Sequence, residues 1–150
     1  MSQIRELYQQ IILDHNKSPR NFRVMPDATR TVEGYNPLCG DHYTIYLKLE
    51  GEKIVDISFD GAGCAISKSS ASVMSQMLKG KTREEAEKLF QEFHDLVTGK
   101  WNGQDDLESL GKLAAFAGVS DYPARVKCAS LAWHTMHSAL TTNNAKVSTE

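Results

Sequence analysis

The stretch DHYTIYLKLEGEKIVDISFDG, residues 41–61, decides the fold. Its first half alternates apolar and more polar residues, the apolar set being Tyr43, Ile45, Leu47 and Leu49. Its second half alternates in the same way, with one face formed by Val55, Ile57 and Phe59. Period-two alternation is typical of a strand with one buried face. The polar turn at residues 50–53 therefore predicts an antiparallel hairpin.

Helical periodicity flanks this hairpin. Before it, Ser2–His15 has apolar residues at helical spacing, and a further strand is expected around Thr29–Gly34. After it, four helices are expected: Ile66–Leu78, a helix with the capping box TREE (Thr82–Glu85) ending near Val97, a short helix in LESLGKLAAFAG begun by Asp105 or Asp106, and a long helix with Pro123 in its first turn. We therefore expect one α+β domain over residues 1–150, with a small antiparallel sheet packed by helices and a frayed tail at 143–150.

Composition narrows the class of protein. The chain has 150 residues, 41% of them hydrophobic and 24% charged, which is typical of one globular domain. A net charge of -2 argues against a general nucleic-acid binder. Apolar runs are much shorter than the roughly 18 residues of a membrane span, and MSQIRELYQQ lacks a signal-peptide pattern. A cytoplasmic protein without membrane or nucleic-acid partners is expected.

The chain holds three cysteines: Cys39, Cys64 and Cys128. An odd number in an intracellular protein disfavours disulfides and favours metal binding or reactivity. Cys39 lies in a loop before the hairpin, Cys64 between the last strand and a helix, and Cys128 early in the last helix. Their spacings are long and include no Cys-x-x-Cys, so spacing alone leaves open that they are small buried hydrophobes.

Asp41 lies two residues after Cys39. In an extended chain such residues point to the same side, and Gly40 between them adds no side chain. Three thiolates and one carboxylate make the four ligands of tetrahedral zinc. The carboxylate is the harder and weaker ligand, which favours a site with one exchangeable corner. A turn or capping role is the other interpretation of Asp41.

The remaining titratable residues are weaker candidates. The histidines are interpreted as surface or partly buried imidazoles rather than ligands: His15, His42, His94, His134 and His137. Near Cys128, Arg125 or Lys127 is a candidate to balance the negative charge of a thiolate-rich site.

Three motifs, NPLCGD, GAGCAISKSSASVM and RVKCASLAW, each contain one cysteine. Together they resemble the IscU/NifU-type scaffold family, and most closely its SufU branch, over nearly the whole chain. The resemblance implies a three-stranded antiparallel sheet in an α+β domain. It also implies a metal site formed by Cys39, Asp41, Cys64 and Cys128.

Three departures from the scaffold members select the branch. Lys127 stands where those proteins carry a histidine, a Leu-Pro-Pro-Val-Lys stretch is missing before it, and residues 81–118 form a helical insertion. SufU-like proteins are zinc-dependent sulfurtransferases that accept sulfur from a SufS-type cysteine desulfurase and pass it toward the Suf cluster-assembly complex. The resemblance assigns acceptance to Cys39. The alternatives are a scaffold assembling an iron–sulfur cluster on the same four residues, and a structural zinc module.

Overall fold

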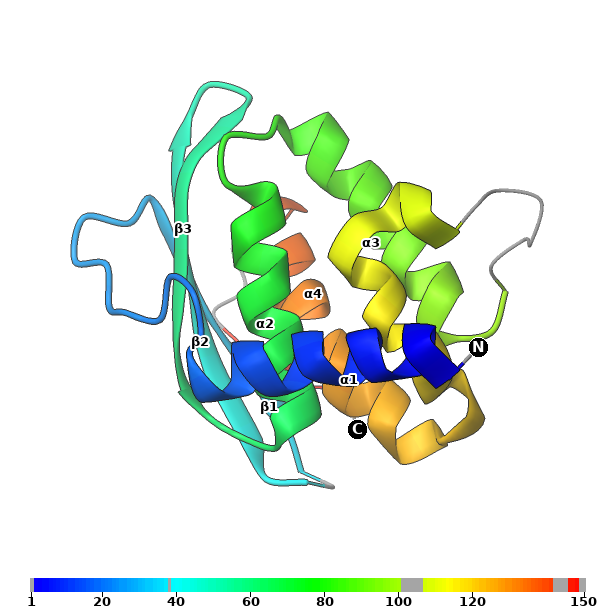
Figure 1. Ribbon diagram of the computed structural model, residues 1–150. Coiled ribbons are helices and arrows are strands. Elements are labelled where there is room, and N and C mark those ends of the chain that lie inside the picture. Colours follow the sequence, from blue (N-terminus) through cyan, green and yellow to red (C-terminus); the bar gives the residue numbers. More distant parts are fainter. Residues whose placement is uncertain (1, 38, 101–106, 142–145, 149–150) are drawn as a thin grey trace.

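The computed structural model describes residues 2–37, 39–100, 107–141 and 146–148. Its sheet has the strand order β3-β2-β1-β4. The strands are β1 (Arg30–Asn36), β2 (Asp41–Glu50), β3 (Lys53–Ala62) and β4 (Lys146–Ser148). The helical elements are α1 (Ser2–Lys17), α2 (Ala65–Leu78), α3 (Arg83–Val97), η1 (Leu107–Asp121) and α4 (Pro123–Thr141). The helices gather on one side of the sheet (Figure 1). This arrangement is an α+β fold, as predicted.

The predicted hairpin and third strand are confirmed. Strand β2 pairs antiparallel with both β1 and β3, and Tyr43, Ile45 and Leu47 on β2 are at most 1% exposed. Strand β4 pairs in parallel with β1. A strand was not expected in that part of the chain, where the sequence predicted a frayed tail; the other residues of 143–150 lie outside the described ranges.

The predicted burial pattern of β3 is wrong at the beginning of the strand. Ile54 is fully buried and Val55 is half-buried, the reverse of simple alternation with Ile57. A register shift between Lys48 and Leu49 explains the difference, because Lys48 pairs with Asp56 whereas Leu49 pairs with Ile54. The extra residue in β3 forms a bulge that turns Ile54 toward the helices.

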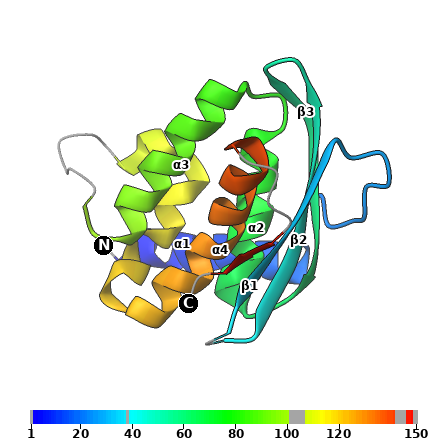
Figure 2. The same ribbon diagram turned by 180° about the vertical axis from the view of Figure 1, so that it is seen from behind.

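Helices α2 and α4 pack directly on the sheet, and α1, α3 and η1 pack outside them (Figure 2). His15 of α1 is 1% exposed, and its Nδ1 lies 2.7 Å from Ser72 Oγ of α2. Burial lowers the pKa of His15 to about 4, so the imidazole is neutral near pH 7. The sequence interpreted His15 as a surface or partly buried imidazole, and the structure corrects this, because the ring is fully buried between α1 and α2.

The segment 81–118 contributes to the same hydrophobic core as the sheet. Helix α3 begins with the predicted capping box, in which Thr82 and Glu85 each accept a hydrogen bond from the other's backbone N–H. The element η1 has a break at Gly111, where φ is 61°. The proposed caps Asp105 and Asp106 lie outside the described residues. Within the described ranges, no helix has the length and apolar character to cross a membrane.

Candidate metal centre

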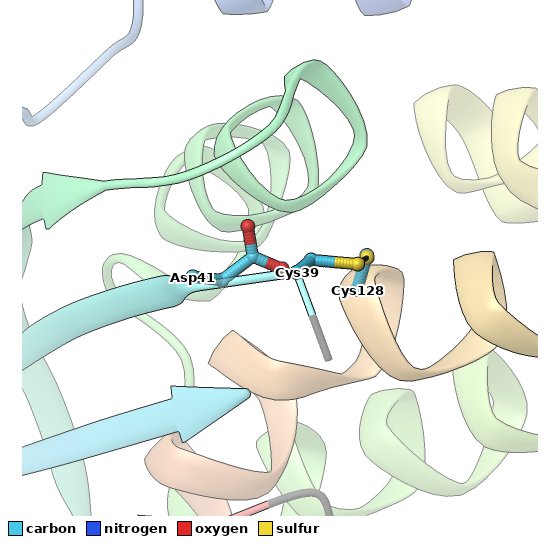
Figure 3. A group of neighbouring side chains, drawn as sticks. All are labelled: Cys39, Asp41 and Cys128. Carbon is cyan, nitrogen blue, oxygen red and sulfur yellow. Dashed lines mark hydrogen bonds between the residues drawn. The ribbon is translucent and has the colours of Figure 1, made fainter. Parts of the chain in front are cut away.

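Three of the four predicted ligands meet at one end of the sheet. One ligand atom from each of Cys39, Asp41 and Cys128 lies within 4.8 Å of the other two (Figure 3). Cys39 comes from the loop between β1 and β2, Asp41 begins β2, and Cys128 lies on α4. Cys39 and Cys128 are 89 positions apart in the sequence. They come together because α4 packs against β1 and β2.

Asp41 is fully buried and has hydrogen-bond partners on both carboxylate oxygens. Its Oδ1 accepts the backbone N–H of Cys64 at 2.8 Å, and its Oδ2 accepts Asn36 Nδ2 at 3.3 Å. The first bond ties the start of β2 to the start of α2. Asp41 thus has a structural hydrogen-bonding role and also faces the two sulfurs, so the two sequence interpretations are compatible.

The sulfurs of Cys39 and Cys128 are in direct contact. The Cys128 thiol donates a hydrogen bond to Cys39 Sγ at 3.0 Å. Cys39 is exposed, whereas Cys128 is 3% exposed. Burial raises the pKa of Cys128, and its hydrogen bond with Cys39 and the nearby Cys64 charge raise it further. Cys128 therefore needs a cation beside it to become a thiolate near pH 7.

The third cysteine borders this group without joining it. Cys64 is the N-cap of α2, and its Sγ accepts the backbone N–H of Ser67 at 3.4 Å. It also lies 3.6 Å from Ser67 Oγ. Its backbone N–H, rather than its thiol, contacts Asp41. A side-chain contact with Cys64 is nevertheless among the causes that raise the pKa of Cys128, so the Cys64 thiol lies near that sulfur. A role as the fourth ligand requires Cys64 to exchange its Ser67 contacts for the metal.

The predicted charge-balancing residues, Arg125 and Lys127, precede Cys128 on α4. Arg125 is exposed, and its guanidinium lies 4.6 Å over the Tyr122 ring. Lys127 is half-buried. Within the described residues, neither forms a hydrogen bond or an ion pair with the three cysteines or Asp41. Their role in balancing the negative charge of the centre stays a prediction.

The other four histidines contact side chains outside the metal-compatible group. His94, His134 and His137 surround Phe90, with the His137 ring stacked on it at 4.4 Å. His42 is exposed beside Glu33. Among the described residues, the metal-compatible group contains no histidine.

Comparison with known proteins decides the family. The model of the family described as "NifU-like N terminal domain" matches residues 7–129 of this chain. The chain belongs to the NifU-like N-terminal domain family. Its matched region includes all three cysteines and Asp41.

Members and relatives of the family differ in their described roles. The chain is 45% identical to the zinc-dependent sulfurtransferase SufU of Bacillus subtilis over 130 residues, covering 87% of this chain and 86% of that protein. It is 36% identical to the iron–sulfur cluster assembly scaffold protein IscU of Streptococcus pyogenes over 140 residues, 93% of this chain and 86% of that one. The family match thus places the chain among iron–sulfur cluster assembly proteins.

Solved structures agree with this assignment. A crystal structure of FiSufU from Fervidobacterium islandicum, described as a cluster assembly scaffold protein for the SUF system, superposes with a TM-score of 0.82. It is 37% identical, and the match covers 91% of this chain and 98% of that one. A NifU-like protein from Brucella abortus has the same fold, with a TM-score of 0.80 at 20% identity and coverage of 91% and 94%.

The donor set at this NifU-like centre suits zinc. Two thiols and a carboxylate are ligands that zinc accepts, and tetrahedral geometry places bound donors about 3.5–3.8 Å apart. Donors already within 4.8 Å of one another need only small movements to reach that spacing. A bound cation would also stabilise the ionised forms of Asp41 and Cys128, because burial penalises a negative charge that has no positive partner. A site of this kind is compatible with a structural zinc module, with a scaffold and with a sulfur acceptor.

Sequence reasoning missed three polar residues around the centre. Asn36, Tyr43 and Ser67 are each at most 1% exposed, and each contacts a predicted ligand or its neighbour. Asn36 directly precedes the proline of NPLCGD, but an isolated asparagine in a turn motif indicates a turn rather than a buried contact. Tyr43 has the apolar spacing of a core residue. Neither pattern identifies a partner across the fold.

The contact between Cys39 and Cys128 predicts how the metal-free protein oxidises. In metal-free protein, hydrogen peroxide is expected to join these two thiols in a disulfide, with both protons and two electrons passing to peroxide to form two waters. Their 3.0 Å separation makes this pair the nearest candidate for a disulfide. Peptide mapping after alkylation should show a Cys39–Cys128 bond and alkylated Cys64. A disulfide that includes Cys64 as the main product would contradict this prediction.

Proposed function

We propose that this protein is a zinc-dependent sulfur acceptor, which takes persulfide sulfur from a SufS-type cysteine desulfurase and relays it to the Suf cluster-assembly complex in the cytoplasm. One observation carries the proposal: Cys39 is an exposed thiol in a group whose other two donors, Asp41 and Cys128, are buried. A partner can reach Cys39 while the rest of the centre stays inside the protein. The similarity to the Bacillus SufU supports the same conclusion.

The loop that carries Cys39 favours this role. Gly40 has φ of +71°, a conformation that side chains with a Cβ rarely adopt, and open space surrounds its Cα. Cys39 therefore lies at an exposed turn, whereas Cys128 is buried within α4. This difference in surroundings supports Cys39 as the thiol that leaves the centre.

The transfer itself is thiol–disulfide exchange. The Cys39 thiolate attacks the outer sulfur of the desulfurase persulfide, forming a sulfur–sulfur bond to Cys39. The original sulfur–sulfur bond breaks, and its electron pair leaves on the desulfurase cysteine as a thiolate. The product is a persulfide on Cys39, with no net oxidation. The reaction requires an accessible thiolate, and the exposure of Cys39 provides the access.

The residues that would hold zinc are Cys39, Asp41 and Cys128, with Cys64 as the fourth in exchange for its contacts with Ser67. Bound zinc supplies positive charge that keeps these thiols deprotonated and protects them from oxidation. Loss of the N-cap contact of Cys64 costs little, because a sulfur acceptor forms only a weak cap compared with an oxygen.

The proposal predicts where sulfur appears. Freshly purified protein should contain about one zinc per chain and, on incubation with a SufS-type desulfurase and L-cysteine, gain the mass of one sulfur. Peptide mapping should place that sulfur on Cys39, and Cys39→Ala should remove the mass shift. Asp41→Ala should reduce zinc content as well as transfer, because it removes a ligand and the tie to α2.

Two controls make this test decisive. His42→Ala changes an exposed residue beside Asp41 that lies outside the metal-compatible group, so it should accept sulfur normally. The Cys39→Ala variant should remain folded by circular dichroism, because Cys39 is exposed. Zinc-free wild-type protein, or persulfide located on another cysteine, would overturn the proposal.

The second candidate is a scaffold that assembles an iron–sulfur cluster on the same four residues. It is favoured by the similarity to proteins described as IscU scaffolds, such as the Streptococcus protein. Anaerobic reconstitution with iron and sulfide separates the two functions. A stable chromophore that transfers to an apo-protein would favour the scaffold, whereas zinc retention with persulfide formation favours the acceptor.

A further inference from the structure

Asn36 connects two of the candidate ligands. It is the last residue of β1, lies opposite Asp41 of β2 in the sheet register, and is fully buried. Its Nδ2 donates to Asp41 Oδ2 at 3.3 Å and to Cys128 Sγ at 3.6 Å. One amide nitrogen therefore reaches ligands supplied by the sheet and by α4.

The chemistry of this amide suits anionic acceptors. The nitrogen carries two hydrogens, enough for one bond to the carboxylate and one to the sulfur. Hydrogen bonds to ionised acceptors are stronger than those between neutral groups, and they gain further where water is excluded. When both ligands are ionised, Asn36 contributes donors without adding charge or occupying a coordination position.

Cys39 stands in a different environment. It is exposed, whereas Asn36, Asp41 and Cys128 are each at most 3% exposed. The centre is thus divided into a buried part on regular secondary structure and an exposed thiol in a loop. A buried hydrogen-bonded network holds its members more rigidly than a loop holds Cys39.

We propose that Asn36 is a positioning residue that holds Asp41 and Cys128 as a fixed pair, so that zinc stays bound when Cys39 leaves to take up sulfur. This inference rests on the proposed function, since it concerns the same zinc site. It assigns to Asn36 the retention of metal during transfer, a task distinct from accepting sulfur. Loss of such outer contacts typically weakens metal binding by about 10–100-fold.

The test measures zinc rather than activity. Asn36→Leu keeps a similar side-chain shape and removes the amide, and Asn36→Ala removes it with less bulk. Competition against a chromophoric chelator should show zinc affinity lower by about 10–100-fold in both variants. Ser70→Ala is the matched control, because it removes a buried hydrogen bond to the carbonyl of Ala129, next to Cys128, without touching a ligand. Its zinc affinity should equal that of the wild type.

The retention role has its own readout. Cys39→Ala should still hold zinc after dialysis, whereas Cys39→Ala combined with Asn36→Leu should lose it. Equal zinc retention in these two proteins would overturn the inference, as would unchanged zinc affinity in Asn36→Leu. Loss of zinc from Cys39→Ala alone would overturn it too, because no fixed pair then holds the metal.

A measurement on the wild type covers the case in which the Asn36 variants do not fold. In a zinc titration followed by NMR, the side-chain amide signals of Asn36 should shift and become protected from hydrogen exchange. Those of Asn21, which bonds to Ser75 farther along α2, should not. Asn36 amide signals that neither shift nor gain protection from hydrogen exchange on addition of zinc would contradict the inference. Persulfide on Cys39 of the wild type is measured separately, so failure of the proposed function is distinguishable from failure of this role.

Discussion

Gly63→Ala is expected to abolish zinc binding and sulfur acceptance while leaving the sheet and helices in place. A Cβ at residue 63 would lie 2.5 Å from Asp41 Oδ1, 2.6 Å from Ser67 Oγ and 2.6 Å from Tyr43 Oη. Contacts this short force one of the groups to move. The three oxygens converge on Gly63 from β2 and from the first turn of α2.

The residues around position 63 leave little room for the new methyl group. Asp41, Tyr43 and Ser67 are at most 1% exposed, and the Tyr43 hydroxyl lies 3.0 Å from Ser67 Oγ. Burial also raises the pKa of Tyr43, so its hydroxyl stays protonated and bound within this cluster. Either these side-chain oxygens or the segment before α2 must shift, and movement of Asp41 or of that segment breaks the 2.8 Å bond from the Cys64 N–H to Asp41. The change acts on two candidate ligands at once.

The measurement is zinc affinity by chelator competition, together with the mass of the persulfide product. We expect zinc affinity to fall by at least about 100-fold, the upper range for loss of outer-shell support. Overpacking should cost about 1–3 kcal/mol of unfolding free energy. Gly118→Ala is the matched control, because open space surrounds that position and its φ is ordinary. Normal zinc affinity in Gly63→Ala would show that the centre does not depend on this packing.

The sequence predicted the fold well where side-chain period is decisive. Alternation over Tyr43–Leu47 predicted the buried face of β2, and the capping box at Thr82 predicted the start of α3. It failed at Ile54, because a bulge changes the register between two strands without changing the composition of either. It did not predict β4, whose three residues pair with β1 from the far end of the chain.

The candidate site was predictable in its ligands and less so in its geometry. The two-residue spacing of Cys39 and Asp41, together with the family motifs, predicted the four ligands. The structure brings three of them together and leaves Cys64 as a helix cap. Local spacing has no information on which way the Cys64 side chain turns, nor on the contacts of Asn36 with Asp41 and Cys128, since 92 residues separate Asn36 from Cys128. Such contacts depend on how α4 packs on the sheet.

The largest stability effect is expected from Phe93→Ala in α3. Phe93 is 1% exposed and stacks on Trp133 of α4, with ring centroids 4.7 Å apart and an interplanar angle of 15°. Its ring also meets Phe116 of η1 edge-on at 5.8 Å. Removing a buried aromatic side chain typically costs about 3–5 kcal/mol. That is a large share of the roughly 5–15 kcal/mol that stabilises an ordinary domain.

This prediction tests what the segment 81–118 does. We propose that it is an insertion relative to the scaffold members. Two arrangements of its helices are then distinguishable, a separable docking arm and a part of the domain core. An arm of that kind would tolerate Phe93→Ala with little change in the rest of the domain. The stacked pair instead joins α3 to the helix that carries Cys128, five residues before Trp133. The segment 81–118 therefore contributes packing contacts to the helix on which Cys128 lies.

Urea unfolding followed by tryptophan fluorescence measures the effect, in a Trp101→Phe background that leaves Trp133 on α4 as the reporter. Gln91→Ala, an exposed residue on the same helix, should change the unfolding free energy by no more than about 0.5 kcal/mol. Zinc should raise the midpoint of Phe93→Ala, since a ligand of the folded state stabilises it by mass action. A loss below about 1 kcal/mol for Phe93→Ala would indicate that α3 is a separable arm. A loss near the expected range would show that α3 belongs to the same core as α4, the helix on which Cys128 lies.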